Sequence, residues 1–568
     1  MIVNHRPTRR GTELAQLSER MEGLWHKNAI VYTIDVQSFA DGNGDGIGDF
    51  LGLSGKLDYL SGLNINCIWL QPFYPSPYRD HGYDITDYYS IDPRFGTLGE
   101  FVEFSQAAHE RGIRIITDLV VNHTSIDHPW FQEARRDKAS KYRDWYVWSK
   151  EKPPDAEQGM AFPGVQKSTW TYDEAAGEYY YHRFYDHQPD LNTGNPAVRA
   201  EIARIIKAWV QLGVSGFRVD ALPFVISTKG PGSTAFADHP EYLIDLRQVL
   251  SWQRGDAVFM AEANLPPDQV SMYFGEGDRT HVIFNFYVNQ HLWLALAREQ
   301  AQPILDAYAA LPQIPKYCQW ANFLRTHDEL DLGRLNDEER AEVFRAFGPD
   351  ANMQLYNRGI RRRAAPMLGN NRARLELAHS LNLTLPGTPV MRYGDEIGMG
   401  DDLSLKERDS VRTPMQWANT RNAGFSNADR LAVPVIQNGE FGYERVNVAA
   451  QQRDPDSFLN WVERMTRLRL RSPEFGNSVC QWLEVSDPAV LAHCCAGEQS
   501  CVFAVHNLSG RELDVTVKLG RHAQGLFDVL KDCDFPADGD GCQRIHLKPY
   551  GYLWLRDGHG CECGGAAK

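Results

Sequence analysis

The sequence predicts an α/β fold: a (β/α)8 TIM barrel with an inserted subdomain after strand 3 and a C-terminal antiparallel β-sandwich domain. Three observations predict this fold. Short apolar runs alternate with amphipathic helical patterns along most of the chain. The regular spacing fails once, between the third and fourth runs. After about Pro473 the helical patterns stop, and alternating β patterns replace them.

Eight short apolar runs are the predicted barrel strands. They span residues 29–36, 67–70, 114–121, 216–221, 258–263, 281–286, 322–328 and 389–394. Helical patterns such as 98–112 and 374–385 separate most of them. Strands that alternate with helices pair in parallel, and eight such units close a barrel.

The long gap between the third and fourth strands sets the domain boundaries. Roughly 95 residues are too many for a structureless loop, so an inserted subdomain is the better explanation. The predicted division is a first barrel part with an N-terminal extension (1–122), the inserted subdomain (123–195), a second barrel part (196–473), a C-terminal β domain (474–557) and a disordered tail (558–568).

Composition excludes several classes of protein. The chain has 568 residues, of which 43% are apolar and 23% charged, as in soluble globular proteins. A net charge of −15 argues against nucleic acid as a partner. No run of 18 apolar residues predicts a membrane span. Because the first residues carry no apolar leader pattern, we expect a cytoplasmic location, with the ten cysteines as reduced thiols. No signal in the sequence identifies the oligomeric state.

Polar residues gather where the predicted strands end. Arg218 and Asp220 lie on one face of the fourth strand, because side chains alternate. Taken alone, this pair could be a structural ion pair. However, Asp118, Glu262 and the His327-Asp328 pair lie at the ends of three other strands. Barrel enzymes work at that rim, so the concentration of polar groups predicts an active site.

Four ordered motifs on these strands resemble one family. DLVVNH, GFRVDA, AEAN and FLRTHD are similar to the motifs of the α-amylase superfamily, glycoside hydrolase family 13. GYDITDY, QPDLN, YGDEIGM and RTPMQW resemble the branch that contains α-glucosidases, oligo-1,6-glucosidases and trehalose synthases. Within that branch AEAN, GIRRR and RDSVRTPMQW are most similar to trehalose synthases.

The resemblance implies roles for three carboxylates. Asp220 would be the nucleophile that forms a covalent glucosyl-enzyme, and Glu262 the general acid and base. A retaining pair of this kind stands ~5–5.5 Å apart. Asp328 would bind sugar hydroxyls, and Arg218 would hold Asp220 ionised and oriented.

The resemblance also implies a set of sugar-binding residues: Tyr83, Asp84, His123, Gln188, Arg218, His327 and Arg412. Tyr83 would stack against the sugar ring. Two alternatives stay open, because His327 could be a buried structural histidine and Asp84 a turn residue.

The loop DGNGDGIGD, residues 41–49, predicts one structural cation. Its candidate ligands alternate along the chain: Asp41, Asn43, Asp45, Ile47 and Asp49, the fourth through its carbonyl. Position twelve is Gly52, so the loop is not an EF-hand. We expect Ca²⁺, with Mg²⁺ as an alternative and a metal-free polar turn as the other possibility.

The resemblance implies an enzyme that acts on a small α-glucoside with retention of configuration. The favoured activity is conversion of maltose to trehalose by glucosyl transfer inside a closed pocket, with side hydrolysis. The alternative is an α-glucosidase that hydrolyses short α-glucosides. A non-catalytic sugar-binding barrel, or one like the heavy chains of amino-acid transporters, is less favoured because all three carboxylates are present.

Overall fold

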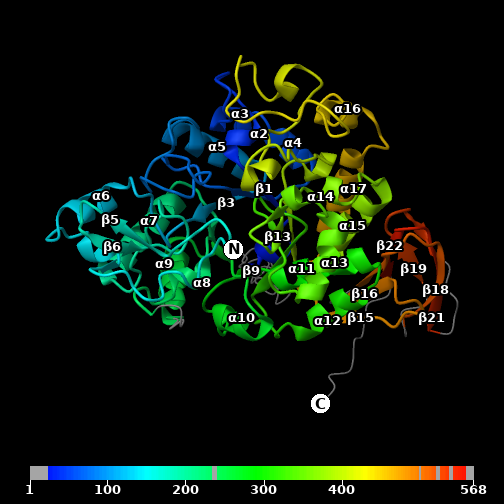
Figure 1. Cartoon of the computed structure of the whole chain (residues 1–568). Helices are drawn as coiled ribbons and strands as arrows, with labels where there is room; N and C mark the ends of the chain where they lie inside the picture. Colours follow the sequence, from blue (N-terminus) through cyan, green and yellow to red (C-terminus); the bar gives the residue numbers. More distant parts are fainter. Residues whose placement is uncertain (1–23, 233–238, 498–499, 520–524, 536–540, 558–568) are drawn as a thin grey trace, which may run out of the picture.

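A computed structural model describes residues 24–232, 239–497, 500–519, 525–535 and 541–557. The predicted disordered tail and most of the N-terminal extension lie outside these residues. Eight parallel strands close a barrel in the centre of the molecule (Figure 1). In barrel order they are β1 (Val31–Ile34), β14 (Thr388–Arg392), β10 (Gln319–Phe323), β9 (Val282–Phe284), β8 (Val258–Ala261), β7 (Gly216–Val219), β3 (Arg114–Leu119) and β2 (Cys67–Leu70). The predicted barrel is confirmed.

The seventh predicted strand differs most from the structure. It was expected over residues 322–328, but β10 ends at Phe323. Asn289 Nδ2 donates to the carbonyls of Phe323 and Leu324 at 2.6 and 3.2 Å, and Trp293 Nε1 also donates to Leu324. These side chains take the place of strand pairing. His327 and Asp328 therefore lie in the loop after the strand.

Helices cover the outside of the barrel and share one core with it. The longer ones are α5 (Leu98–Glu110), α7 (Pro196–Gln211), α9 (Glu241–Gln253), α11 (Phe286–Arg298), α12 (Gln302–Ala310), α13 (Asp337–Phe347), α15 (Arg372–Thr384) and α17 (Phe458–Leu470). Local sequence signals set their starts: Thr97 and Glu100 form a capping box before α5, and Asn195 caps α7. No helix in the described part of the chain is long and apolar enough to span a membrane.

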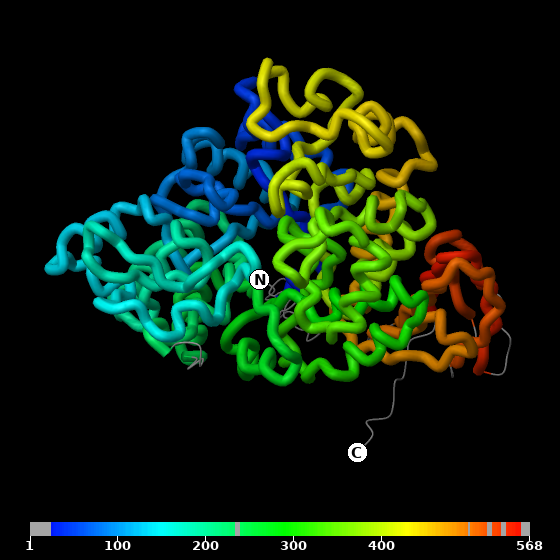
Figure 2. Tube along the Cα trace, in the orientation of Figure 1, coloured from blue at the N-terminus to red at the C-terminus, as the bar shows by residue number. Residues whose placement is uncertain are grey.

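The chain between β3 and α7 forms a separate lobe. It contains α6 (Pro129–Arg136) and a three-stranded sheet in the order β4 (Trp148–Ser149), β6 (Glu178–Tyr181), β5 (Trp170–Asp173). In Figure 2 this lobe, in cyan, lies on the opposite side of the barrel from the C-terminal strands, in orange and red.

Two antiparallel sheets form the C-terminal domain. The larger has the order β15 (Cys480–Trp482), β16 (Val490–Ala496), β17 (Cys501–Asn507), β22 (Tyr552–Asp557), β19 (Leu526–Asp528), β20 (Cys533–Asp534). The smaller pairs β18 (Leu513–Lys518) with β21 (Cys542–Leu547). Apolar side chains of both sheets meet in one buried cluster, as in a sandwich.

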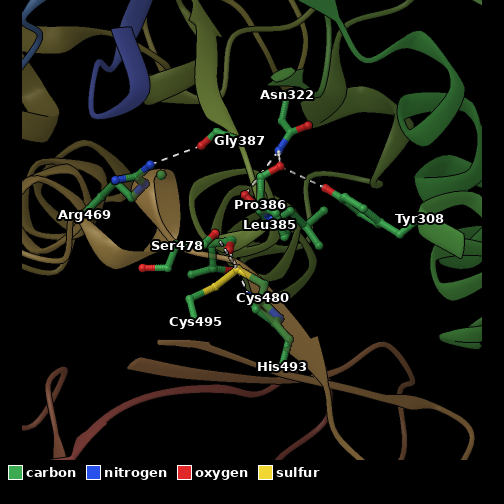
Figure 3. Close-up of a disulfide and its surroundings, with 12 residues drawn as sticks. Tyr308, Asn322, Leu385, Pro386, Gly387, Arg469, Ser478, Cys480, His493 and Cys495 are labelled. Carbon is green, nitrogen blue, oxygen red and sulfur yellow. Dashed lines mark hydrogen bonds between the residues drawn. A yellow bond between two sulfur atoms is a disulfide. The ribbon is translucent and has the colours of Figure 1, made fainter. Parts of the chain in front are cut away.

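Cys480 and Cys495 form a disulfide, so the prediction that these two are reduced thiols is wrong (Figure 3). The cause is strand register. Antiparallel pairing places Cys480 of β15 directly opposite Cys495 of β16, with the two Cα atoms 4.2 Å apart. Such a pairing depends on which strands become neighbours, which the sequence does not show.

Candidate active site

Arg218 lies at the centre of three carboxylates where β3, β7 and β8 end. Its Nη1 donates to Asp118 Oδ1 and to Asp220 Oδ1, both at 2.6 Å. Its Nη2 lies 2.8 Å from Glu262 Oε2. Register places Asp118 beside Arg218 on neighbouring strands. One guanidinium group therefore holds the two predicted catalytic carboxylates, Asp220 and Glu262, next to each other.

The backbone around Asp220 also positions Glu262. Ala221 has a φ of 48°, in the left-handed region, which costs a residue with a side chain about 1–2 kcal/mol. In this conformation its N–H donates to Glu262 Oε2 at 2.9 Å. At the start of β7, Gly216 lets the strand approach β8, because a Cβ there would lie 2.3 Å from the Val258 carbonyl oxygen. Both features bring Asp220 and Glu262 together.

Burial raises the pKa of Asp220 to about 6 and that of Glu262 to about 7, although Arg218 lowers both. Burial likewise raises the pKa of Asp118 to about 6. Three carboxylates share one cation, so desolvation outweighs the attraction. Near neutral pH Asp220 is therefore mostly ionised, while Glu262 still carries a proton in much of the protein. A nucleophile and a general acid need these two states.

Asp328 has the opposite environment. Burial alone would raise its pKa, but His327 and three arginines, Arg408, Arg412 and Arg218, lower it below its usual range. Arg408 Nη1 and Arg412 Nη2 lie 2.6 and 3.1 Å from Asp328 Oδ1. Because burial also lowers the pKa of His327, the arginines supply the positive charge. Asp328 is therefore ionised at neutral pH.

A cavity of about 1250 Å³ opens beside these groups. Six of the predicted site residues line it: Tyr83, His123, Asp220, Glu262, His327 and Asp328. Aromatic side chains line other parts of the wall, among them Phe162, Phe224 and Tyr356. Apolar walls with a few convergent polar groups are typical of small-molecule sites.

Tyr83 is fixed by the histidine beside it. Its ring stacks on that of His327, with centroids 5.5 Å apart, and its hydroxyl lies 2.7 Å from His327 Nε2. The Tyr83 carbonyl binds His123 Nε2 at 3.1 Å. Burial lowers the pKa of His123 to about 4, so this imidazole is neutral at the cavity wall.

Asp84 does not line the cavity. Its carboxylate accepts a bond from Ser76 Oγ at 2.9 Å and bonds from the N–H groups of Arg79 and Asp80, both at 3.2 Å. A turn with positive φ at His81 directs it back into its own loop. The predicted contact between Asp84 and the sugar therefore does not match its position in the structure. Asp84 stabilises its own loop, in agreement with the alternative that it is a turn residue.

Asp80 and Arg408 were missed, and both line the cavity. Arg408 Nη2 lies 2.7 Å from Asp80 Oδ1, so this arginine bridges Asp80 and Asp328. The signals were present, since Asp80 stands just before GYDITDY and Arg408 begins RDSVRTPMQW. Sequence alone did not show which acid and which arginine of each motif face the cavity.

The three other predicted residues, Gln188, Arg412 and Arg218, lie one layer behind the wall of this cavity. Gln188 Nε2 donates to Asp80 Oδ2 at 2.9 Å. Arg412 binds Asp328 and also donates to the His327 carbonyl at 2.9 Å. With Arg218, each of them holds a carboxylate that lines the cavity.

The predicted cation loop is closed by its own backbone. Asp41 accepts bonds from the N–H groups of Gly44 and Gly46 at 2.6 and 2.8 Å. Asp49 accepts from three further N–H groups, one of them that of Gly52 at 2.6 Å. Burial, with Asp41 nearby, raises the pKa of Asp49. Within the described ranges, no group of three or more His, Cys, Asp or Glu side chains is arranged to hold a metal ion.

Comparisons with known proteins agree with this geometry. Residues 33–477 match the model of the α-amylase catalytic domain, and residues 480–554 match that of the maltogenic amylase C-terminal domain. The chain is 43% identical to the trehalose synthase/amylase TreS of Mycobacterium tuberculosis over 94% of this chain and 90% of that protein. It is 33% identical to an oligo-1,6-glucosidase of Parageobacillus thermoglucosidasius over 79% of this chain and 84% of that protein.

A solved structure shows the same architecture. The trehalulose synthase MutB of Pseudomonas mesoacidophila superposes with a TM-score of 0.75 at 26% identity, covering 94% of this chain and 99% of that one. The catalytic-domain match covers most of the chain, and it includes every residue of the Arg218 and Asp328 networks. The chain therefore belongs to the α-amylase family, glycoside hydrolase family 13.

Proposed function

We propose that the protein transfers a glucosyl unit within this cavity and converts maltose to trehalose, with hydrolysis as a side reaction. The observation that carries the proposal is the Arg218 network, in which one guanidinium joins Asp220 and Glu262 at the cavity. The identity to the trehalose synthase/amylase TreS, higher than to an oligo-1,6-glucosidase, supports trehalose formation accompanied by hydrolysis.

The chemistry follows from the two pKa environments. Ionised Asp220 attacks the anomeric carbon, while protonated Glu262 gives its proton to the leaving oxygen. Because both carboxylates bind one guanidinium, their geometry favours the short spacing of ~5–5.5 Å that retaining enzymes need. Glu262 then takes a proton from the acceptor hydroxyl, which attacks the glucosyl–Asp220 ester.

The remaining polar groups bind the sugar in this proposal. Asp328 stays ionised and accepts hydrogen bonds from sugar hydroxyls. The same negative charge favours the cationic transition state. Tyr83 and His327 form one wall of the site, with His123 beside them. Arg408 orients Asp80 and Asp328 together, as a bidentate guanidinium can.

Product analysis tests the proposal. The enzyme is incubated with maltose, trehalose and sucrose separately, and sugars are followed by NMR. We expect trehalose to form from maltose faster than free glucose accumulates. With trehalose as substrate, in which both anomeric carbons are α, we expect the first glucose released to be the α-anomer. Glucose without trehalose at any time from maltose makes the protein an α-glucosidase. An initial β-anomer from trehalose excludes the retaining mechanism.

We also propose that the loop of residues 41–49 binds one divalent cation, Ca²⁺ or alternatively Mg²⁺, with a structural role. The order of Asp41, Asn43, Asp45, Ile47 and Asp49 supports it. The proximity of Asp41 to the buried Asp49 also supports it, because a cation would relieve their repulsion. The ion takes no part in the reaction.

A cytoplasmic location remains a prediction. The Cys480–Cys495 disulfide offers a test, because the reduced thiol pool of that compartment would keep the pair open. Alkylation of thiols at the moment of lysis, followed by mass spectrometry, gives the oxidation state of the two cysteines in the cell.

A further inference from the structure

Two tyrosines and one glutamate join the inserted lobe to the barrel loops beside the cavity. The hydroxyls of Tyr185 and Tyr356 both donate to Glu407 Oε2, at 2.9 and 2.8 Å, and lie 3.1 Å from each other. Tyr185 belongs to the lobe, while Tyr356 and Glu407 come from loops that follow β10 and β14. We name Tyr185, Tyr356 and Glu407 the tyrosine latch.

The latch covers a side chain of the cavity wall. Phe162 lines the cavity, and its ring packs against Tyr185 and Tyr356, with centroid distances of 4.6 and 4.9 Å. The Arg408 guanidinium lies 5.2 Å from the centroid of the same ring. Glu407 directly precedes Arg408, which holds Asp328. The latch therefore connects the outer wall with the sugar-binding carboxylate.

Side chains, not strand pairing, make this junction. The lobe sheet β4-β6-β5 pairs only within itself in the described residues. The same holds for the small sheet β11 (Leu330–Asp331), β13 (Gly359–Ile360), β12 (Gln354–Leu355), which flanks Tyr356. A further tie is the bond from Arg358 Nη2 to the Ala161 carbonyl at 3.2 Å. A junction of a few side chains can open without unfolding either side.

Backbone strain at the latch supports the same conclusion. Tyr356 and Glu407 have φ values of 53° and 39°, and Asn357 has 59°. Left-handed conformations of residues other than glycine are strained and persist only where surrounding contacts fix them. The hydrogen bonds to Glu407 are such contacts, so losing one favours release of the loop.

We propose that the tyrosine latch decides between glucosyl transfer and hydrolysis, an inference that rests on the proposed function. The glucosyl–Asp220 ester can be attacked by a hydroxyl of the retained glucose or by water. In either case the bond from the anomeric carbon to Asp220 breaks, a bond to the acceptor oxygen forms, and Glu262 takes the acceptor's proton. A closed latch keeps the glucose in place and excludes water.

Two variants and a matched control test the latch. Tyr356→Phe and Tyr185→Phe each remove one hydrogen bond to Glu407. The control is Tyr550→Phe, because Tyr550 also has a positive φ, of 55°, and donates to a glutamate, Glu299, at 2.8 Å, but lies in the C-terminal domain. The readout is the ratio of free glucose to trehalose formed from maltose, measured with total maltose consumption and the melting temperature.

Each latch variant is expected to raise the ratio of glucose to trehalose roughly tenfold, the effect of losing one hydrogen bond to a charged group. Total maltose consumption should stay near the wild-type rate in Tyr185→Phe, since Tyr185 does not line the cavity, and the control should match the wild type. Added ¹³C-labelled glucose should enter trehalose more readily in the latch variants, because an open cavity exchanges its glucose.

Different results would contradict the role of the latch and the proposed function. If the wild type forms trehalose and both latch variants keep its product ratio and its low uptake of labelled glucose, the latch has no role in partition. If the latch variants lose total activity and stability together with an unchanged ratio, their role is structural and the inference is wrong. A wild type that forms glucose alone overturns the proposed function, and the latch role with it.

Discussion

The two arginine networks of the active site treat buried carboxylates in opposite ways. Arg218 alone serves Asp118, Asp220 and Glu262, whereas Arg408 and Arg412 both bind Asp328. The side chains of Glu262 and Asp328 are similarly exposed, at 24% and 22%. Nevertheless burial raises the pKa of Glu262 to about 7, while His327 and the arginines lower that of Asp328 against the effect of burial.

The number of cations per carboxylate, more than burial, therefore assigns the roles. Where one guanidinium is shared among three acids, protons bind and leave near neutral pH, as acid–base catalysis requires. Where two guanidinium groups surround one acid, the charge is permanent, as sugar binding and transition-state stabilisation require.

The largest effect is expected from Asp220→Asn. The amide cannot form the covalent intermediate, so turnover of maltose should fall on the order of 10⁴-fold or more. The melting temperature should stay close to that of the wild type, because the shape of the side chain is kept. Turnover near the wild-type level would show that Asp220 is not the nucleophile.

A smaller loss is expected from Arg408→Lys. A lysine cannot bridge Asp80 and Asp328 as the two Nη atoms do, so kcat/KM for maltose should fall roughly 10²-fold. Arg421→Lys is the matched control, because Arg421 pairs with the exposed Asp429 outside the cavity. Equal kinetics for both variants would remove the second network from the account.

The pH dependence separates the two networks. The rate constant kcat/KM should fall below a pH of about 6, where Asp220 becomes protonated, and above about 7, where Glu262 loses its proton. Asp328 should add no limb near neutral pH, since its pKa is lowered. Glu262→Gln, assayed on a chromogenic α-glucoside with an acidic leaving group, should lose the alkaline limb. An alkaline limb that persists in this variant belongs to another group.

The smallest effect on catalysis is expected from the loop of residues 41–49. Asp45→Ala should lower the melting temperature in Ca²⁺ by a few degrees and leave kcat nearly unchanged, because the ion stabilises only the native state. Chelation should lower the melting temperature of the wild type to that of the variant and leave the melting temperature of the variant unchanged. A wild type without metal by elemental analysis, insensitive to chelator, would falsify the cation site.

Much of the fold could be predicted because its signals are local. Strand and helix patterns gave the eight barrel strands in order, and four motifs at their ends indicated Asp220, Glu262 and Asp328. The end of the seventh strand could not be predicted, because Asn289 and Trp293 of a neighbouring helix bind its last carbonyls. Such contacts depend on tertiary packing.

The errors in the site and in the C-terminal domain have the same origin. Asp80 and Asp84 are four residues apart in one loop, and the positive-φ turn at His81 and Gly82 lies between the one that lines the cavity and the one that does not. The disulfide of Cys480 and Cys495 depends on the register between two strands. Sequence patterns identify residue types and elements well, but the orientation of loop side chains depends on long-range contacts.

Covalent trapping identifies the nucleophile without any assumption about the product. The Glu262→Gln variant is incubated with 5-fluoro-α-D-glucosyl fluoride, whose fluoride leaves without protonation, and the protein is digested and analysed by mass spectrometry. We expect one fluoroglucosyl group per chain, attached to Asp220. A label at position 262, on Asp118 or on Asp328 instead would contradict the assignment of Asp220 as the nucleophile. Fluoride release with no labelled protein at any time would contradict it as well.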